Sequence, residues 1–191
     1  MSSTASLAIF GGILYGSFFI STWFFALKRR GATFRDAGFQ RTTLGVLLLM
    51  VPVLLAVMFV NGLLLLALRN LIDGIPTLQE QVLPEGEKPQ LSDMPWLMLE
   101  AAVLAPLVEE FIFRGLLYRY LRGKRGVHTA TMLSAFLFAI AHFTLGLVPS
   151  LFVLGVVLTV VVERDNSIYP AITLHALLNG TAIAILFAAP A

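Results

Sequence analysis

The sequence predicts an all-α protein, a polytopic bundle of about six transmembrane helices. Of its 191 residues, 58% are hydrophobic and only 13% are charged, whereas a soluble domain is about half apolar and a quarter charged. The mean hydropathy is correspondingly high, at +0.88. The charged residues also gather in short clusters between long apolar stretches, which is typical of membrane helices joined by loops.

The composition excludes several classes of function. The net charge of +2 does not indicate nucleic-acid binding, because the positive residues lie in short clusters between apolar stretches. The absence of cysteine excludes disulfides, thiolate metal sites and a cysteine nucleophile. No loop is long enough to hold a core of its own, so we expect residues 1–191 to form a single integral membrane domain in the lipid bilayer.

The first two spans are expected from about Ser6 to Leu27 and from about Thr43 to Ile72. The loop between them carries five basic residues: Lys28, Arg29, Arg30, Arg35 and Arg41. An excess of Lys and Arg marks a cytoplasmic loop, which predicts an N-terminus outside the cell. No basic segment precedes the first apolar run, so we expect no signal peptide.

The remaining spans follow an acidic, proline-containing stretch, residues 73–94, that is expected to be an external loop. The third span is expected from Pro95 to about Leu121, the fourth from about His128 to Leu145, the fifth to about Val162, and the sixth to about Ala189. This count predicts a multi-pass protein of the cell membrane with both termini outside. Pro106 lies inside the third span and predicts a kink, because it cannot donate a backbone hydrogen bond.

Two carboxylates and a guanidinium interrupt the apolar third span at Glu109, Glu110 and Arg114. Charges at membrane depth are costly and usually face a protein interior or a wet cavity. At about 100° per residue, Glu110 and Arg114 share one helix face, whereas Glu109 points about 100° away from Glu110. We therefore expect Glu110 and Arg114 to form a buried ion pair and Glu109 to be free to act as a general base.

Two histidines and an asparagine lie in the later apolar spans. Phe138 and His142 are four residues apart, as are His175 and Asn179, so each pair is expected to share one helix face. A lone histidine in a helix is more often a packed residue than a catalyst. Here the rise per residue puts Glu109, His142 and Asn179 at similar depths, with His175 shallower, which is compatible with one shared cavity.

This set of side chains allows two chemistries. In the first, Glu109 takes a proton from water, His142 orients that water or protonates the leaving amine, and the His175–Asn179 pair stabilises an oxyanion. In the second, Glu109, His142 and His175 bind one zinc ion, as two histidines and a glutamate do in zinc peptidases. Residue spacing alone does not decide between them.

Three motifs, EExxxR at residues 109–114, FxxxH at 138–142 and HxxxN at 175–179, occur in this order, each on its own expected helix. This arrangement resembles the CAAX-protease-and-bacteriocin-processing (CPBP) family, which includes the type II CAAX prenyl endopeptidases, and the resemblance covers about Ala101 to Ala182. It implies a catalytic core at residues 95–189.

The resemblance also implies roles and partners. It implies Glu109 as the base that activates water, with His142 beside it. It implies His175 and Asn179 as groups that position the oxyanion or the water, and Glu110 with Arg114 as a supporting pair. The expected function is therefore an intramembrane endopeptidase that needs no cofactor, with zinc as the alternative, and that acts on a peptide or membrane-protein substrate.

Two further classes of function are compatible with span number and hydropathy. One is a non-enzymatic immunity or scaffold protein that keeps the polar cluster for packing. The other is a small transporter that uses Glu109 and the histidines as a proton relay. The ordered motifs favour the protease, because a scaffold gains nothing from the His175–Asn179 pair. Such a transporter would more often show paired structural repeats, which the sequence lacks.

Overall fold

The structure of the chain is a computed structural model that describes residues 3–75, 80 and 90–188, with side chains described from residue 9 onward. Within these ranges the chain forms helices and connecting turns, and no strand. The predicted all-α membrane bundle is therefore confirmed. Most of the expected external loop, residues 76–79 and 81–89, lies outside the described residues.

Seven α-helices with more than one turn make up the described bundle. In chain order they are α1 (Ser3–Thr22), α2 (Leu44–Arg69), α4 (Met94–Leu99), α5 (Ala105–Glu110), α6 (Arg119–Ile140), α7 (Val148–Asp165) and α8 (Tyr169–Ala188). Two π-helical segments, Glu100–Leu104 and Phe111–Tyr118, join α4 to α5 and α5 to α6. The stretch from Met94 to Tyr118 is thus one long rod, called the central rod below. Helix α6 is interrupted at Gly126, whose φ of 76° and ψ of 171° are not helical, so the chain bends there between the expected third and fourth spans.

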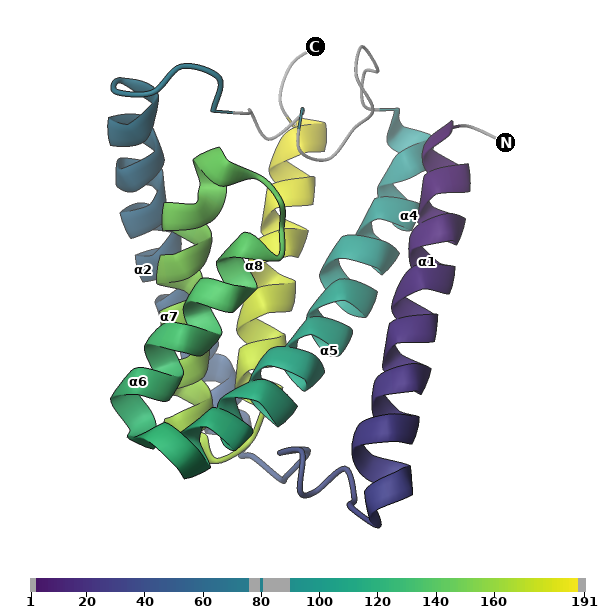
Figure 1. Cartoon of the computed structure of the whole chain (residues 1–191). Helices are drawn as coiled ribbons and strands as arrows, with labels where there is room; N and C mark the ends of the chain where they lie inside the picture. The colour runs from purple at the N-terminus through teal and green to yellow at the C-terminus, as the bar shows by residue number, and fades with distance from the viewer. Residues whose placement is uncertain (1–2, 76–79, 81–89, 189–191) are drawn as a thin grey trace.

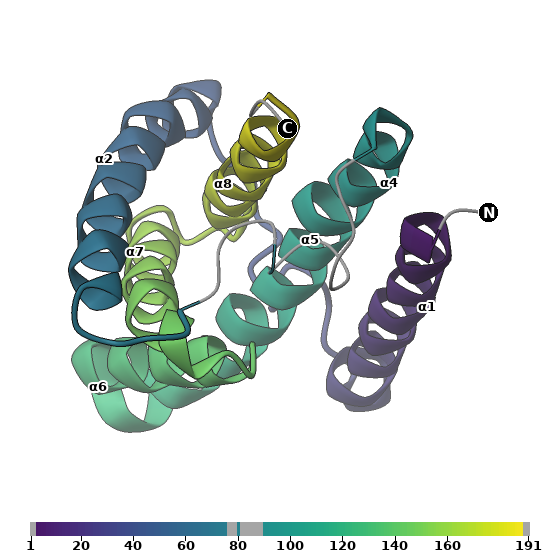
Figure 2. The same ribbon diagram turned by 90° about the horizontal axis from the view of Figure 1, so that it is seen from above.

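The central rod lies between α1 on one side and the other helices on the other (Figures 1 and 2). Helix α1 packs on α4, α5 and the π-helical segment between them, and α8 packs on the opposite side of the same rod. Helices α6 and α7 pack closely together, and α2 covers α7 and α8. The first turn of α1 and the last turn of α8 lie at the same end of the bundle (Figure 1).

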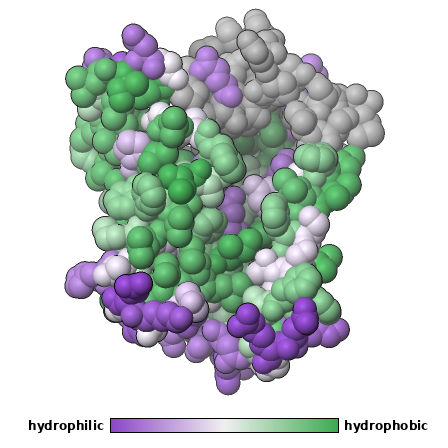
Figure 3. Space-filling model, in the orientation of Figure 1, coloured by the Kyte–Doolittle hydropathy of each residue, from purple (hydrophilic) through white to green (hydrophobic). Residues whose placement is uncertain are grey.

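The surface of the bundle divides into an apolar band and a hydrophilic end (Figure 3). The hydrophilic end is opposite the first turn of α1, where Lys28–Arg30 follow the helix. An apolar band bounded by basic residues is the pattern of a protein set in a bilayer. The chain is a multi-pass membrane protein, and the cytoplasmic location of its basic end remains a prediction.

Four described stretches are long and apolar enough to cross a membrane: Ile9–Arg30, Leu44–Arg69, Leu145–Asp165 and Tyr169–Ala188. They correspond to the expected first, second, fifth and sixth spans. The other two expected spans fall short for a physical reason: the central rod carries charged side chains, and α6 begins with a basic segment. The count of six spans therefore stays a prediction.

A π-helical segment, Glu100–Leu104, lies just before Pro106, where the sequence predicted a kink. The amide of Ala105 donates to the carbonyl of Glu100, five residues back, instead of four. The next amide in this pattern would donate to Ala101, but it belongs to Pro106, which has no N–H. Single-turn π segments inside α-helices are frequent at functional sites. Here the segment lies directly before the turn that carries Glu109.

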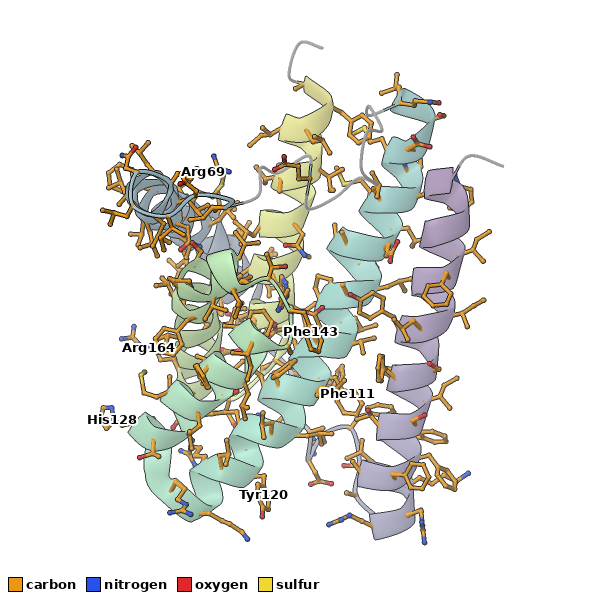
Figure 4. The ribbon with its side chains drawn as sticks, turned by 45° about the horizontal axis from the view of Figure 1, so that its top comes forward. Arg69, Phe111, Tyr120, His128, Phe143 and Arg164 are labelled. Carbon is orange, nitrogen blue, oxygen red and sulfur yellow. The ribbon has the colours of Figure 1, made fainter. Side chains whose placement is uncertain are left out.

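The expected fourth span, His128–Leu145, is wrong at its C-terminal end. Helix α6 ends at Ile140, and His142 lies in the turn that follows, not inside a helix. The chain reverses at Phe143, whose φ of 55° is in the left-handed region. Bulky side chains rarely adopt this conformation, and such strained residues cluster at functional sites. The Phe143 side chain is 94% exposed beside the turn (Figure 4).

Candidate active site

The turn of α5 presents two adjacent carboxylates to different surroundings. Glu110 is fully buried, whereas the side chain of Glu109 is 18% exposed. Their offset of about 100° around the helix turns Glu110 toward α7 and α8 and turns Glu109 toward the space between the turn after α6 and α1. The sequence predicted this division.

The predicted ion pair between Glu110 and Arg114 is present. An Arg114 guanidinium nitrogen donates to Glu110 Oε1 at 2.9 Å, and both side chains are fully buried. A second guanidinium nitrogen donates to the carbonyl of Gly155 on α7 at 3.1 Å. The guanidinium also lies 4.3 Å from the centre of the Phe138 ring. These contacts supply the compensation that a buried charge needs.

Helix α7 can reach Arg114 only because Gly155 has no side chain. A Cβ atom at this position would lie 2.9 Å from the Cα of Ala135 on α6, closer than real Cβ contacts. The absence of a side chain therefore lets the two backbones touch and brings the Gly155 carbonyl within hydrogen-bonding distance of the guanidinium.

His175 joins the buried pair to the exposed carboxylate. Its Nδ1 donates to Glu110 Oε1 at 2.9 Å, so this oxygen accepts hydrogen bonds from both His175 and Arg114. Its Nε2 lies 4.0 Å from Glu109 Oε2. The side chain is only 4% exposed. Glu110 therefore holds the imidazole ring of His175, on α8, in one orientation, with its second nitrogen facing Glu109.

His142 reaches the same oxygen of Glu109 from the turn after α6. Its Nδ1 donates to the carbonyl of Phe138 at 2.9 Å, and its Nε2 lies 3.8 Å from Glu109 Oε2. The Phe138 ring packs against both imidazoles, with ring centres 4.8 Å from His142 and 5.8 Å from His175. A carbonyl can only accept, so the Nδ1 of His142 carries a proton and a neutral ring presents the Nε2 lone pair to the site.

Asn179 makes its hydrogen bond to the central rod. Its side-chain nitrogen donates to the carbonyl of Ala101 at 2.8 Å. This is the carbonyl that the π-helical pattern leaves for the amide of residue 106, which is a proline. Asn179 thus supplies a hydrogen-bond donor to a backbone carbonyl beside the site that Pro106 cannot satisfy. The role of Asn179 as an oxyanion donor stays a prediction.

Tyr15 on α1 is a site neighbour that the sequence analysis missed. Its hydroxyl donates to Glu109 Oε1 at 3.3 Å, the carboxylate oxygen that does not face the histidines. A signal was available in the sequence. Gly11, Tyr15 and Phe19 recur every four residues and so share one face of the helix, with a polar tip in mid-span.

The donor set does not form a metal-binding group in this arrangement. Among residues 3–75, 80 and 90–188, no three His, Asp or Glu side chains are placed to hold a metal ion. Both histidines use Nδ1 for a protein acceptor and turn Nε2 toward Glu109, and metal-ligating histidines are held in the same way, so their orientation does not count against zinc. No catalytic step is assigned to zinc, which remains the alternative.

The fold and the site together define a membrane-embedded helical protein with a carboxylate and two imidazoles meeting inside the bundle. Comparison with known proteins identifies the family that this chain resembles. Residues 91–181 match the family model described as type II CAAX prenyl endopeptidase Rce1-like. The predicted resemblance to the CAAX proteases is thereby confirmed over this part of the chain, which contains all seven residues of the three motifs.

The chain is also similar to a curated protein, the membrane-embedded CAAX protease MroQ of Staphylococcus aureus (strain USA300). The two are 30% identical over 109 residues, which are 53% of this chain and 44% of the relative. The chain thus spans less than half the length of the relative that it matches. No solved structure gives a significant match.

Proposed function

We propose that the chain is a CAAX-protease-like intramembrane endopeptidase in which Glu109 activates the attacking water. The observation that carries the proposal is the position of Glu109 Oε2. This atom is buried, has no hydrogen-bond partner among the described residues, and lies 3.8 and 4.0 Å from the Nε2 atoms of His142 and His175. Convergent polar atoms of this kind, next to positioned neighbours, are what a general base requires.

The distances suit a water molecule better than a direct contact. A separation of 3.8 Å is too long for a hydrogen bond between Glu109 and His142. A water oxygen about 2.8 Å from each of the two atoms would bridge them. Donating one proton to Glu109 Oε2 and the other to His142 Nε2, that water would direct an oxygen lone pair toward a bound peptide carbonyl.

The proposed reaction then balances in two steps. The water oxygen bonds to the carbonyl carbon while Glu109 takes one proton, which gives a tetrahedral oxyanion. The carbon–nitrogen bond then breaks, and the leaving amine takes that proton from Glu109, directly or through His142. The products are a new carboxyl terminus and a new amine, and Glu109 returns to its ionised form.

His175 can stabilise the oxyanion only in one protonation state. Because Nδ1 already donates to Glu110, donation from Nε2 requires a ring with both nitrogens protonated. Asn179 keeps a second amide proton, in addition to the one donated to Ala101, and the proposal assigns this proton to the same oxyanion.

The proposed substrate is a peptide or membrane-protein segment that reaches the site from within the bilayer. The expected setting is the cell membrane, with the basic end of the bundle in the cytoplasm and both termini outside. These assignments follow the excess of Lys and Arg in the loops at the basic end. They define which side of a vesicle must carry the substrate in an assay.

Cleavage by purified protein in liposomes tests the proposal. Three quenched fluorescent peptides serve as probes: one with an S-farnesyl cysteine fourth from its end, the same peptide without the farnesyl group, and an apolar membrane-spanning peptide. We expect wild type to cleave at least one of them. Glu109→Gln, which keeps the shape and removes the base, should lower kcat by about 10²- to 10⁴-fold.

Glu163→Gln is the matched control, because Glu163 lies at the basic end and bonds to Arg122 and Tyr118. It should cleave at the wild-type rate. The proposal is overturned if wild type cleaves none of the three peptides while folded, or if Glu109→Gln cleaves as fast as Glu163→Gln. Failure of every peptide would favour the scaffold or immunity class of function.

A further inference from the structure

Helix α1 lies outside residues 91–181, the part matched by the family model, yet it contacts the proposed base. We propose that Tyr15 is a positioning residue of the active site, whose hydroxyl holds Oε1 of Glu109 so that Oε2 faces His142 and His175. The inference rests on the proposed function of Glu109. It adds a residue from a fourth part of the chain to a site built on α5, α8 and the turn after α6.

The two oxygens of Glu109 have different surroundings. Oε1 accepts the hydrogen bond from the Tyr15 hydroxyl at 3.3 Å. Oε2 faces the two Nε2 atoms and has no hydrogen-bond partner among the described residues. A glutamate carboxylate otherwise rotates over a broad range about its terminal bond. The hydroxyl therefore selects the rotation that presents one oxygen to the histidines.

The register of α1 is fixed both before and after Tyr15. Four residues earlier, Gly11 packs against the carboxylate of Glu100, where a Cβ atom would overlap Glu100 Oε1. Four residues later, Phe19 packs on Phe111 of the central rod, with ring centres 5.3 Å apart. Figure 4 shows Phe111 on the side of the rod that faces α1. These two contacts set the height at which Tyr15 meets Glu109.

The other faces of α1 do not fix the position of the helix in this way. Large apolar side chains outside this face are exposed on the helix surface, among them Ile13, Phe18 and Ile20. A helix that only anchored the protein in lipid would need no hydroxyl in mid-span. The face formed by Gly11, Tyr15 and Phe19 is the part of α1 that meets the central rod, and its polar tip points at the proposed base.

Positioning of this kind acts on turnover more than on substrate binding. Catalytic groups lose much of their effect when they move by about 1 Å, because proton transfer depends on alignment. Removing the hydroxyl leaves the backbone position of Glu109 unchanged, and the proposal gives Tyr15 no contact with the substrate. The expected signature is therefore a lower kcat with an unchanged KM.

Tyr15→Phe tests the inference with the peptide that wild type cleaves. We expect kcat to fall about tenfold, the size of one hydrogen bond to a charged group, with KM within about twofold of wild type. The thermal unfolding midpoint should stay at the wild-type value. Tyr120→Phe is the matched control, because this tyrosine is 59% exposed at the basic end (Figure 4), and it should change neither parameter.

Phe19→Leu separates positioning from helix docking, because it loosens the same face of α1 without touching the hydroxyl. It should lower the midpoint, whereas Tyr15→Phe should not. The inference is overturned if Tyr15→Phe keeps the kcat of Tyr120→Phe, or if its loss of kcat comes with a midpoint as low as that of Phe19→Leu. The proposed function stands in both cases, provided that Glu109→Gln is inactive.

Discussion

The two sides of α5 use the same side chain in opposite ways. On one side, Glu110 is fully buried and accepts hydrogen bonds from Arg114 and His175. On the other, Glu109 is partly exposed, accepts one long hydrogen bond from Tyr15, and leaves Oε2 without a protein hydrogen-bond donor among the described residues. Adjacent positions in one helix thus form a structural side, with Glu110, and the side to which we assign the proposed reaction, with Glu109, called the reactive side below.

This difference shows that surroundings, rather than residue type, divide the work between two neighbouring carboxylates. Glu110 is fully buried, and its Oε1 is shared by two buried donors, so this carboxylate stabilises the bundle and is not accessible to a substrate. Glu109 is partly exposed, so its carboxylate can be reached by water. His175 belongs to both sides, since its two nitrogens face the two glutamates. Variants on the two sides should therefore separate stability from turnover.

The largest expected effect is on the structural side. Arg114→Met should lower the free energy of unfolding by about 3–5 kcal/mol, because it leaves the buried charge of Glu110 without compensation. Thermal unfolding of the detergent-solubilised protein measures this loss. Arg125→Met, at an exposed position of α6, is the control and should change stability little. Equal midpoints for the two variants would contradict the structural role of the pair.

Variants of the two histidines should further separate the structural side of α5 from its reactive side. His175→Gln removes a buried hydrogen bond to Glu110 and should cost about 1–3 kcal/mol of unfolding free energy. His142→Gln, in a side chain that is 31% exposed, should cost at most about 1 kcal/mol. Both should lower kcat by tenfold or more. If the two variants unfold at the same temperature, His175 does not belong to the structural side as described.

Asn179 should fall on the structural side as well. Asn179→Leu removes the donor to the Ala101 carbonyl and should cost about 1–2 kcal/mol in unfolding. In a Pro106→Ala background the cost should shrink, because the restored backbone amide can donate to that carbonyl instead. A double-mutant cycle on thermal stability measures this coupling. A loss of kcat with no coupling in stability would instead assign Asn179 to the oxyanion.

The smallest expected effect concerns metal. If Glu109 acts as a base, a chelator should change the cleavage rate by less than about twofold, because no step needs a bound cation. The measurement is the peptide cleavage rate before and after dialysis against EDTA. Loss of activity on chelation, followed by recovery with added zinc, would contradict the glutamate mechanism and favour the zinc alternative.

The structural side was the easier one to predict from the sequence. The spacing of Glu110 and Arg114 places them on one helix face whatever surrounds the helix, so local geometry was enough. The convergence of Glu109 with His142 and His175 was also expected, from depths compatible with one shared cavity and from the ordered motifs. Composition alone was enough for the fold class, because long apolar stretches with clustered charges have few other structural solutions.

The parts that could not be predicted depend on contacts between distant helices. The spacing from Phe138 to His142 fits a helix equally well, so it gave no warning of the turn after Ile140. The hydrogen bond from Asn179 to Ala101 joins residues far apart in the chain, and it exists because of the π-helical register at Pro106. Tyr15 reaches Glu109 only through the height at which α1 packs, which no local pattern specifies.

The bond from Asn179 to Ala101 has a consequence for the order of assembly during synthesis. Two groups that complete the central rod, Asn179 for its backbone and His175 for Glu110, both come from α8, the last described helix in the chain. A nascent chain that has not yet released α8 from the ribosome therefore lacks both. The proposed active site is therefore complete only after α8 has entered the membrane and packed on the central rod.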